Sequence, residues 1–257
     1  MSWHRLVVIV RHEVRLIARD PSAILILIAF PLITIAFLKP AIRPALVESG
    51  YPDATGAEHV VPGQAVMSAF YLVGMVGFSF FAEHSWMTWD RLRASPATSL
   101  EIVTGKAAPR VILGIAQFAI VLGAGVAVFD LTVRGDGWAL VPLGLAHTVS
   151  LVLLGVAVTA LTRTAQQANG FAFTGLVVFG AVGGAFVPFN TLPDWAQAIA
   201  PITPTYWAMR GMRDIVLEGG GLADVVTPTV VLLGMSALFA AISAARFRAD
   251  QPKQGFA

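Results

Sequence analysis

Long apolar stretches alternate with short charged or turn-forming segments along the whole chain. Each stretch approaches the roughly 20 helical residues that cross a hydrocarbon core about 30 Å thick. We expect no Asp, Glu, Lys or Arg in the interior of these spans, because each such charge costs about 2.5 to 3.5 kcal/mol at the membrane centre. The pattern therefore predicts six transmembrane helices, at 21–38, 62–82, 107–129, 138–161, 169–187 and 225–245.

The composition agrees with a fold built in lipid. Of the 257 residues, 56% are apolar and 12% are charged, whereas about 25% of the residues of soluble domains are charged. The sequence has no cysteine, which excludes a disulfide framework, thiolate zinc sites and cysteine nucleophiles. We predict an all-α membrane protein with a single domain over 1–257. Within it, 1–20 form an amphipathic interface helix, 21–245 the six-span bundle and 246–257 a cytoplasmic tail.

Lysine and arginine are divided unevenly between the two ends of the predicted bundle. Cytoplasmic loops retain positive charge, so we predict a multi-pass plasma-membrane protein (bacterial inner membrane) with both termini in the cytoplasm. Lys39-Pro40 follows the first span in place of a small-residue cleavage site, which predicts a retained anchor and no removable signal peptide. The cytoplasmic side is expected to hold Arg5, Arg11, Arg15, Arg19, Arg91, Arg93, Lys106, Arg110, Arg163, Arg246, Arg248 and Lys253, and the outer side Lys39, Arg43, Arg134, Arg210 and Arg213.

The first 20 residues have the spacing of a basic amphipathic helix. Such a helix lies in the headgroup plane, where anionic lipid attracts its arginines. It could serve only to fix topology, or it could act as a lever against a cytoplasmic partner. The apolar face is predicted from Trp3, Leu6, Val7, Val10, Val14 and Ile17, and the polar face from His4, Arg5, Arg11, His12, Arg15 and Arg19.

A charged segment with two tryptophans, 83–110, separates the second and third predicted spans. Ser95-Pro96 is expected to end one short helix, because a residue before proline is pushed out of helical geometry. Thr98 and Glu101 match a capping box, which predicts that a second short helix starts there. Trp86 and Trp89 are suited to fill an apolar slot on a partner. An ordinary cytoplasmic loop with interfacial tryptophans is the alternative.

The segment 188–222 is moderately apolar, interrupted by prolines and too broken to span. Asp194 is expected to cap a short helix, and Tyr206-Trp207 suits a membrane interface. Irregular backbone at membrane depth persists only when it is buried in protein or faces a watery cavity. We therefore predict a re-entrant outer segment, with a loop lying on the headgroups as the alternative. Its marker residues are Pro188, Pro193, Trp195, Pro201, Pro204 and Tyr206.

Polar residues inside the predicted spans are few, and most are expected to join helices. Gln64, Gln117 and Asn169 are candidates for a substrate path, and His147 is the one plausible ionisable group in these spans. Interhelical amide bonds and small-residue contacts hold membrane bundles together without any substrate. A packing role is therefore the stronger expectation for each of them.

The order of these features resembles the ABC-2-type permeases, the membrane halves of ATP-driven exporters of drugs, glycans and lipids. The likeness covers nearly the whole chain. It begins with the basic leader helix, Phe30-Pro31 in the first span and the run 89–96 followed by Glu101-Ile102 and Gly105-Lys106. It continues with Gly184-Ala185-Phe186-Val187-Pro188, Leu192-Pro193-Asp194-Trp195, Pro201, Pro204, Tyr206 and Arg210.

This resemblance implies a coupling helix around 86–94 that docks into a groove of a separate ATP-binding cassette subunit. That subunit would bind ATP and magnesium, and a second permease half, identical or related, would complete the transporter. The implied cargo is lipophilic or amphiphilic: a drug, a lipid or a glycan. No nucleic acid partner is expected. The implied coupling residues are Trp86, Trp89, Asp90, Arg91, Leu92, Arg93 and Pro96.

The residues themselves predict no catalytic or metal site in this chain. Gly105-Lys106 lacks the upstream glycine and the hydroxyl residue of a phosphate-binding loop. His12-Glu13 lacks the second histidine of a zinc motif, so we predict no bound cofactor. Replacing Trp89 or Asp90 is expected to leave folding intact while uncoupling ATP hydrolysis from transport.

Two other classes of protein stay open. An ion-coupled secondary transporter usually needs ionisable groups within the membrane, and the predicted spans offer His147 but no carboxylate. The first three spans also do not mirror the last three, as an inverted repeat would require. The other class is a noncatalytic membrane anchor or assembly protein.

Overall fold

A computed structural model describes residues 2–247 and residue 253, with the backbone alone for residues 22–24. The described part is all helical and contains no strand. Arg248 and most of the predicted tail at 246–257 lie outside it. The α-helices are α1 (Trp3–Ala18), α2 (Pro21–Glu48), α3 (Ala57–Ser68), α4 (Tyr71–Ser85), α5 (Trp89–Ala94), α6 (Ser99–Val128), α7 (Leu140–Leu161), α8 (Ala165–Val182), α9 (Asp194–Ile199), α10 (Pro204–Val216) and α11 (Val226–Arg246). Three short 3-10 helices are η1 (Gly137–Ala139), η2 (Phe189–Thr191) and η3 (Ala200–Ile202).

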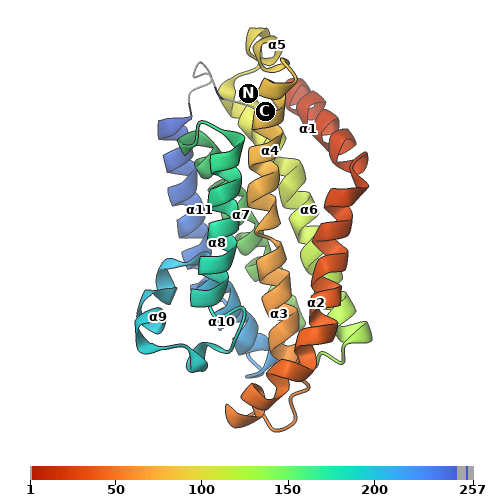
Figure 1. Cartoon of the computed structure of the whole chain (residues 1–257), viewed down its shortest axis with the longest axis vertical. Helices are drawn as coiled ribbons and strands as arrows, with labels where there is room; N and C mark the ends of the chain where they lie inside the picture. The colour runs from red at the N-terminus through yellow and green to blue at the C-terminus, as the bar shows by residue number, and fades with distance from the viewer. Residues whose placement is uncertain (1, 248–252, 254–257) are drawn as a thin grey trace.

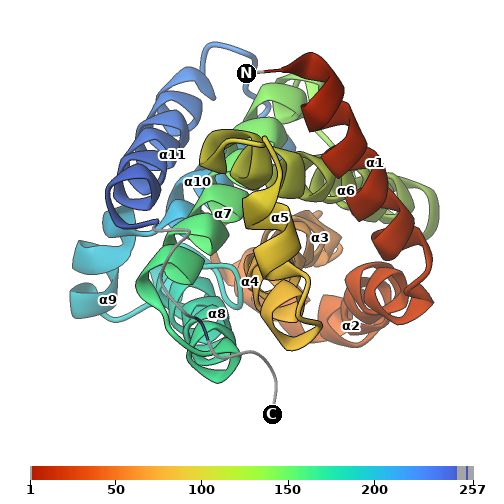
Figure 2. The ribbon, with the colours of Figure 1, turned by 90° about the horizontal axis from the view of Figure 1, so that it is seen from above.

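The long helices run side by side, and α5, α1 and the end of α11 lie at one end of the bundle (Figure 1). The connection from α2 to α3 lies at the opposite end (Figure 1). Seen from the α5 end, α5 lies over the bundle and α1 runs along its rim (Figure 2). The structure therefore has two chemically different ends, which we call the α5 end and the far end.

Five helical segments of the described chain are long and apolar enough to cross a membrane: Leu25–Glu48, Ala57–Ser85, Ser99–Val128, Gly137–Leu161 and Val226–Arg246. The second segment contains α3 and α4, which follow each other with an interruption of two residues. α8 occupies the position of the predicted fifth span. Its first turns contain Gln166, Gln167 and Asn169, which lower its apolar character. The sixth span therefore remains a prediction.

Several predicted boundaries were wrong because helices extend past the signals that were expected to end them. α2 continues through Pro40 and Pro44 to Glu48, ten residues beyond the predicted end. Membrane helices tolerate proline, since neighbouring helices and local adjustments satisfy the freed backbone groups. The capping box of Thr98 and Glu101 is confirmed, but it opens the 30-residue α6 and not a short helix.

α7 lies at the centre of the packing and contacts α4, α6, α8, α10 and α11. Its buried side chains include Leu143 and Val156. His147 is also fully buried, and its Nε2 lies 3.2 Å from the Val66 carbonyl oxygen on α3. The largest apolar cluster combines residues of α3, α6, α7, α10 and α11. This core fixes the positions of the helices that carry the site described below.

The start of α3 at the far end is held by a buried carboxylate. Glu58 accepts backbone hydrogen bonds from Thr55 (2.9 Å) and Gly56 (3.1 Å), and the Thr132 hydroxyl donates to it at 2.9 Å. Gly56 has a φ of 98°, and a Cβ at this position would collide with the Lys39 carbonyl oxygen of α2. Only glycine fits this close approach of α2 and α3.

Candidate functional site

α5 is attached to the bundle by its first residue. Trp89 is 6% exposed, and its ring stacks on His84 at 4.7 Å between centroids. It also meets the edges of Phe80 at 6.3 Å and Phe247 at 6.5 Å. Aromatic pairs of this kind add about 0.5 to 1.5 kcal/mol each beyond the burial of their area. Trp89 therefore joins α5 to the chain's own α4 and to the end of α11, and this burial does not suit a role as an anchor in a partner.

The outward surface of α5 is polar. Asp90, Arg91 and Arg93 are exposed, and Arg93 lies 3.9 Å from Asp90 in an exposed pair. Leu92 is half-buried, and Pro96 offers its carbonyl oxygen to the Arg5 guanidinium of α1. These charged side chains form a small projecting surface, which we call the α5 surface, defined by Asp90, Arg91 and Arg93.

Trp86 lies outside α5, so the predicted helix at 86–94 is shorter than expected. Trp86 caps the end of α4 and Met87 has a φ of 57°, which breaks the chain between the two helices. Trp86 is 55% exposed and Met87 is 80% exposed. Of the two predicted tryptophans, Trp86 is therefore the accessible one, and it lines a cavity between α1 and α4.

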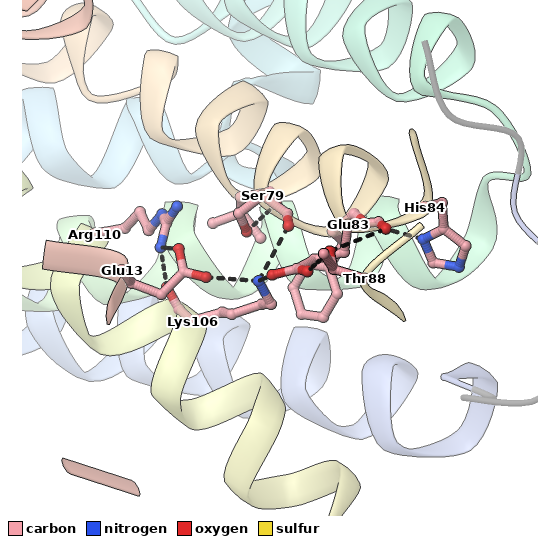
Figure 3. Close-up of polar contacts among 9 residues, drawn as sticks. Glu13, Ser79, Glu83, His84, Thr88, Lys106 and Arg110 are labelled. Carbon is pink, nitrogen blue, oxygen red and sulfur yellow. Dashed lines mark hydrogen bonds and ion pairs between the residues drawn. The ribbon is translucent and has the colours of Figure 1, made fainter. Parts of the chain in front are cut away.

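Four charged side chains from three different helices meet one another (Figure 3). Lys106 of α6 donates to Glu13 of α1 at 2.6 Å, to Glu83 of α4 at 2.9 Å and to the Ser79 carbonyl oxygen at 3.1 Å. Arg110, one turn further along α6, pairs with the other oxygen of Glu13. We call Glu13, Glu83, Lys106 and Arg110 the charge network.

The charge network is buried, so water does not solvate its charges. Lys106 and Glu13 are each 1% exposed. Desolvating charges is costly, and the cost is recovered only when each charge is paired and bonded in good geometry. Two acids and two bases give a net charge of zero. Each member is therefore stable only in the presence of the others, which couples α1, α4 and α6.

The network also reaches α5. The Thr88 hydroxyl, directly before α5, donates to the second oxygen of Glu83 (Figure 3). The Thr88 backbone N–H donates to the Glu83 carbonyl oxygen at 3.0 Å. A displacement of α5 would therefore act directly on Glu83, and through Lys106 on α1 and α6.

Sequence reasoning missed this network. The expectation that the spans contain no charged interior residues was wrong, because Arg110 lies inside the third predicted span and Glu83 and Lys106 lie on the same helices as spans. One signal was present: Gly105 precedes Lys106, and a Cβ at 105 would collide with Ile9 of α1. The absent side chain lets α1 approach α6 closely enough for Lys106 to reach Glu13.

α1 has three faces. Leu6, Ile9 and Glu13 are buried against the bundle, mainly on α6. Trp3, Val7 and Val14 form an apolar stripe that is exposed, with Trp3 at 75%. The third face is basic and exposed, and it contains Arg11, Arg15 and Arg19, with Arg5 at its edge. The predicted apolar side is thus divided between protein contact and an exposed stripe.

The structure brings two of the three candidate substrate-path residues together and separates the third. Gln64 and Asn169 line one cavity of about 410 Å³ between α2, α3, α4 and α8, with phenylalanines such as Phe30 and Phe173 around it. Gln117 is 1% exposed and donates to the Ser68 hydroxyl at 2.6 Å, so it joins α6 to α3. A second cavity of about 450 Å³ contains Asn169 together with Glu13, Glu83 and Arg110. Asn169 therefore borders both the apolar cavity and the charge network.

The predicted outer segment consists of short helical pieces between prolines. Pro193 precedes α9, and Asp194 is its first helical residue instead of its cap. Thr203 caps α10, with the Tyr206 N–H donating to its hydroxyl at 3.2 Å, and Pro204 is the first helical residue. Trp195 is exposed, whereas Pro188 and Pro204 are buried. Pro201 accepts a hydrogen bond from the Trp207 indole at 2.8 Å.

These features define a class: a multi-pass helical membrane protein with a projecting charged helix at one end of its bundle. The chain belongs to the ABC-2 type transporter family, whose model matches residues 4–217.

Individual relatives are more distant and longer than this chain. The "Linearmycin resistance permease protein LnrN" of Bacillus subtilis (strain 168) is 27% identical over 150 residues, which cover 58% of this chain and 39% of the relative. The "Probable multidrug ABC transporter permease YbhR" of Escherichia coli (strain K12) is 27% identical over 216 residues, 82% of this chain and 58% of the relative. The "ABC transporter G family member 20" of Dictyostelium discoideum is 27% identical over 182 residues, 67% of this chain and 24% of the relative. The matched region is thus less than two thirds of each relative's length.

Proposed function

We propose that this chain is the membrane subunit of an ATP-binding cassette exporter and that a partner subunit hydrolyses the ATP. The observation that carries the proposal is the α5 surface, which projects from the bundle and is linked to α1, α4 and α6 through the charge network. Family membership and the relatives named as permeases support it. ATP and magnesium belong to the partner in this proposal.

In this mechanism, the partner's groove receives the α5 surface together with the exposed Trp86. Movement of the partner during its ATP cycle displaces α5, and Thr88 transmits the displacement to Glu83. The charge network then passes the displacement from α4 to α1 and α6. Because each buried charge needs its partners, the helices move together rather than separating.

The cargo in this proposal is lipophilic or amphiphilic: a drug, a lipid or a glycan. Its path is the face of α2, α4 and α8, where the two cavities share Tyr71, Gly74 and Asn169. The wall is apolar near Phe30 and charged near Arg110. Along this face an amphiphile would find an apolar surface for its apolar part and charged groups for its polar part. A second permease half, identical or related, completes the path.

The remaining parts of the proposal concern the membrane. We propose six spans with α8 as the fifth, α1 in the headgroup plane with its exposed stripe in lipid, and α9 with α10 as a re-entrant outer segment. The basic face of α1 fits anionic cytoplasmic lipid. The positive-inside rule then puts the α5 end and both termini in the cytoplasm of a cell, with the bundle in its plasma membrane.

An ion-coupled transporter is less well supported. Two buried carboxylates, Glu58 and Glu83, do lie within the candidate span Ala57–Ser85. Both carboxylates, however, already accept hydrogen bonds, Glu58 at the start of α3 and Glu83 in the charge network. Their bonding suits structural and coupling roles.

The test is co-purification of the chain from gently solubilised membranes of its source organism, followed by mass spectrometry. We expect an ATP-binding cassette subunit in the complex. Reversing charges on the α5 surface (Asp90→Arg with Arg93→Glu) should remove that subunit, whereas Asp53→Arg, an exposed change at the far end, should retain it. A stable species without any ATPase would overturn the proposal.

A further inference from the structure

A polar cavity of about 460 Å³ lies at the far end, away from the α5 surface and the charge network. Its walls come from the end of α2, the start of α3, the turn after α8 and one face of α10. The apolar part includes Leu46, Phe189 and Met209, and the polar part includes His59, Tyr206 and Arg210. None of these groups has a part in the proposed coupling mechanism.

The cavity's single carboxylate is already engaged. Glu218 lies 3.1 Å from the Arg213 Nε, and it also interacts with the Tyr51 phenol. Burial raises the pKa of Tyr51, and the neighbouring Glu218 carboxylate raises it further. Tyr51 therefore stays a protonated donor directed to Glu218.

Arg210 supplies a positive charge; Asp214, one turn further along α10, interacts with it electrostatically but forms no ion pair with it. Its guanidinium lies over the Trp207 ring at 5.6 Å from the centroid, and no ion pair to it is found in the part of the chain that the structure describes. Stacking on an aromatic face leaves the in-plane N–H donors of arginine available for a planar or tetrahedral oxyanion. Arg210 is exposed, so these donors are accessible from the cavity.

His59 supplies a second donor or acceptor that lacks a partner. The side chain is 7% exposed, and its Nε2 has no hydrogen-bond partner within residues 2–247 and 253. A buried polar atom without a partner costs about 1 to 3 kcal/mol. Such an atom on a cavity wall points to a ligand group that completes it.

We propose that this far-end cavity binds an oxyanion, a phosphate or carboxylate, carried by an amphiphile, with Arg210 and His59 as its hydrogen-bond donors. The apolar part of the amphiphile, next to its anionic group, contacts Leu46, Phe189 and Met209. This inference does not depend on the proposed ATPase partner, because every group involved lies at the far end of the bundle, opposite the α5 surface.

The test is isothermal titration calorimetry on the full chain in dodecyl maltoside. Dodecyl phosphate is the probe, and the neutral detergent already saturates sites that recognise only a dodecyl tail. We expect saturable binding that Arg210→Gln weakens by at least about tenfold, the value of one hydrogen bond to a charged group. Arg43→Gln is the matched control, because Arg43 is an exposed cation at the same end but outside the cavity.

The outcomes are distinct. Equal weakening by Arg210→Gln and Arg43→Gln, or no saturable binding, would overturn the proposal, since either result means general surface attraction or no site. Inorganic phosphate is titrated separately and should bind more weakly than dodecyl phosphate; equally tight binding would overturn the assignment of the ligand as an amphiphile. His59→Phe should weaken binding as Arg210→Gln does. If His59→Phe fails to fold, the two arginine variants decide alone. Disruption of the α5 surface should leave binding unchanged.

Discussion

At the scale of single residues, each buried charge of the charge network depends on a partner of opposite charge. Lys106 is 1% exposed and satisfied by two carboxylates and a backbone carbonyl. Removing one member leaves a buried charge without its partner, whereas an exposed pair is screened by solvent. The same substitution should therefore have very different effects at a buried and at an exposed ion pair.

We predict that Lys106→Met lowers the free energy of unfolding by about 3 to 5 kcal/mol. The control is Lys39→Met, which breaks the 2.8 Å pair with Asp130, a carboxylate that is 80% exposed. That change should cost about 1 kcal/mol or less. Thermal unfolding of both variants in detergent, followed by tryptophan fluorescence, measures the difference. Equal losses of stability would show that the network contributes no more than a surface pair.

At the scale of elements, α5 is a short helix that depends on one buried side chain. Six residues are too few for a stable isolated helix, so α5 is held by Trp89 inside the bundle and by Thr88 on Glu83. The expectation that Trp89 could be replaced without affecting folding does not fit this burial. Substituting Trp89 and Trp86 one at a time should therefore distinguish an effect on stability from an effect on docking.

Trp89→Ala is predicted to destabilise the chain by about 3 to 5 kcal/mol, because it opens a cavity between Phe80, His84 and Phe247. Trp86→Ala should change stability by less than about 1 kcal/mol, since its ring is 55% exposed. Denaturation in detergent checks stability, and co-purified ATPase checks docking. We expect Trp86→Ala to lose the partner while staying folded. A destabilised Trp86→Ala variant would contradict this separation.

The elements also show what sequence alone can and cannot predict. Apolar length predicted the cores of five spans, and local chemistry predicted the cap of α6 at Thr98. The break at Ser95-Pro96 was also predicted, because it depends on adjacent residues. The pairing of Glu13 with Lys106 joins residues 93 positions apart, and no local pattern reveals it. The burial of Trp89 likewise depends on Phe247, at the other end of the sequence.

At the scale of the whole molecule, the two ends of the bundle differ in chemistry. The α5 end combines the basic face of α1, the α5 surface and Arg163, while the far end holds Lys39, Arg43, Arg134, Arg210 and Arg213. Cytoplasmic loops retain lysine and arginine, and this is the reason for proposing that the more basic α5 end faces the cytoplasm. This is also the compartment in which a soluble ATPase could reach α5.

The natural absence of cysteine makes this orientation directly measurable. We predict that Arg93→Cys, on the α5 surface, is protected from a membrane-impermeant maleimide in intact cells and labelled in inverted vesicles. Asp53→Cys, exposed between α2 and α3 at the far end, should show the opposite pattern. Both positions are exposed in the fold, and the chain is expressed without the proposed ATPase subunit, so differences in labelling report the side of the membrane and neither burial nor a docked partner. Labelling of Arg93→Cys in intact cells would place the α5 surface outside, where no ATP-hydrolysing partner could drive it, and the proposed mechanism would fail.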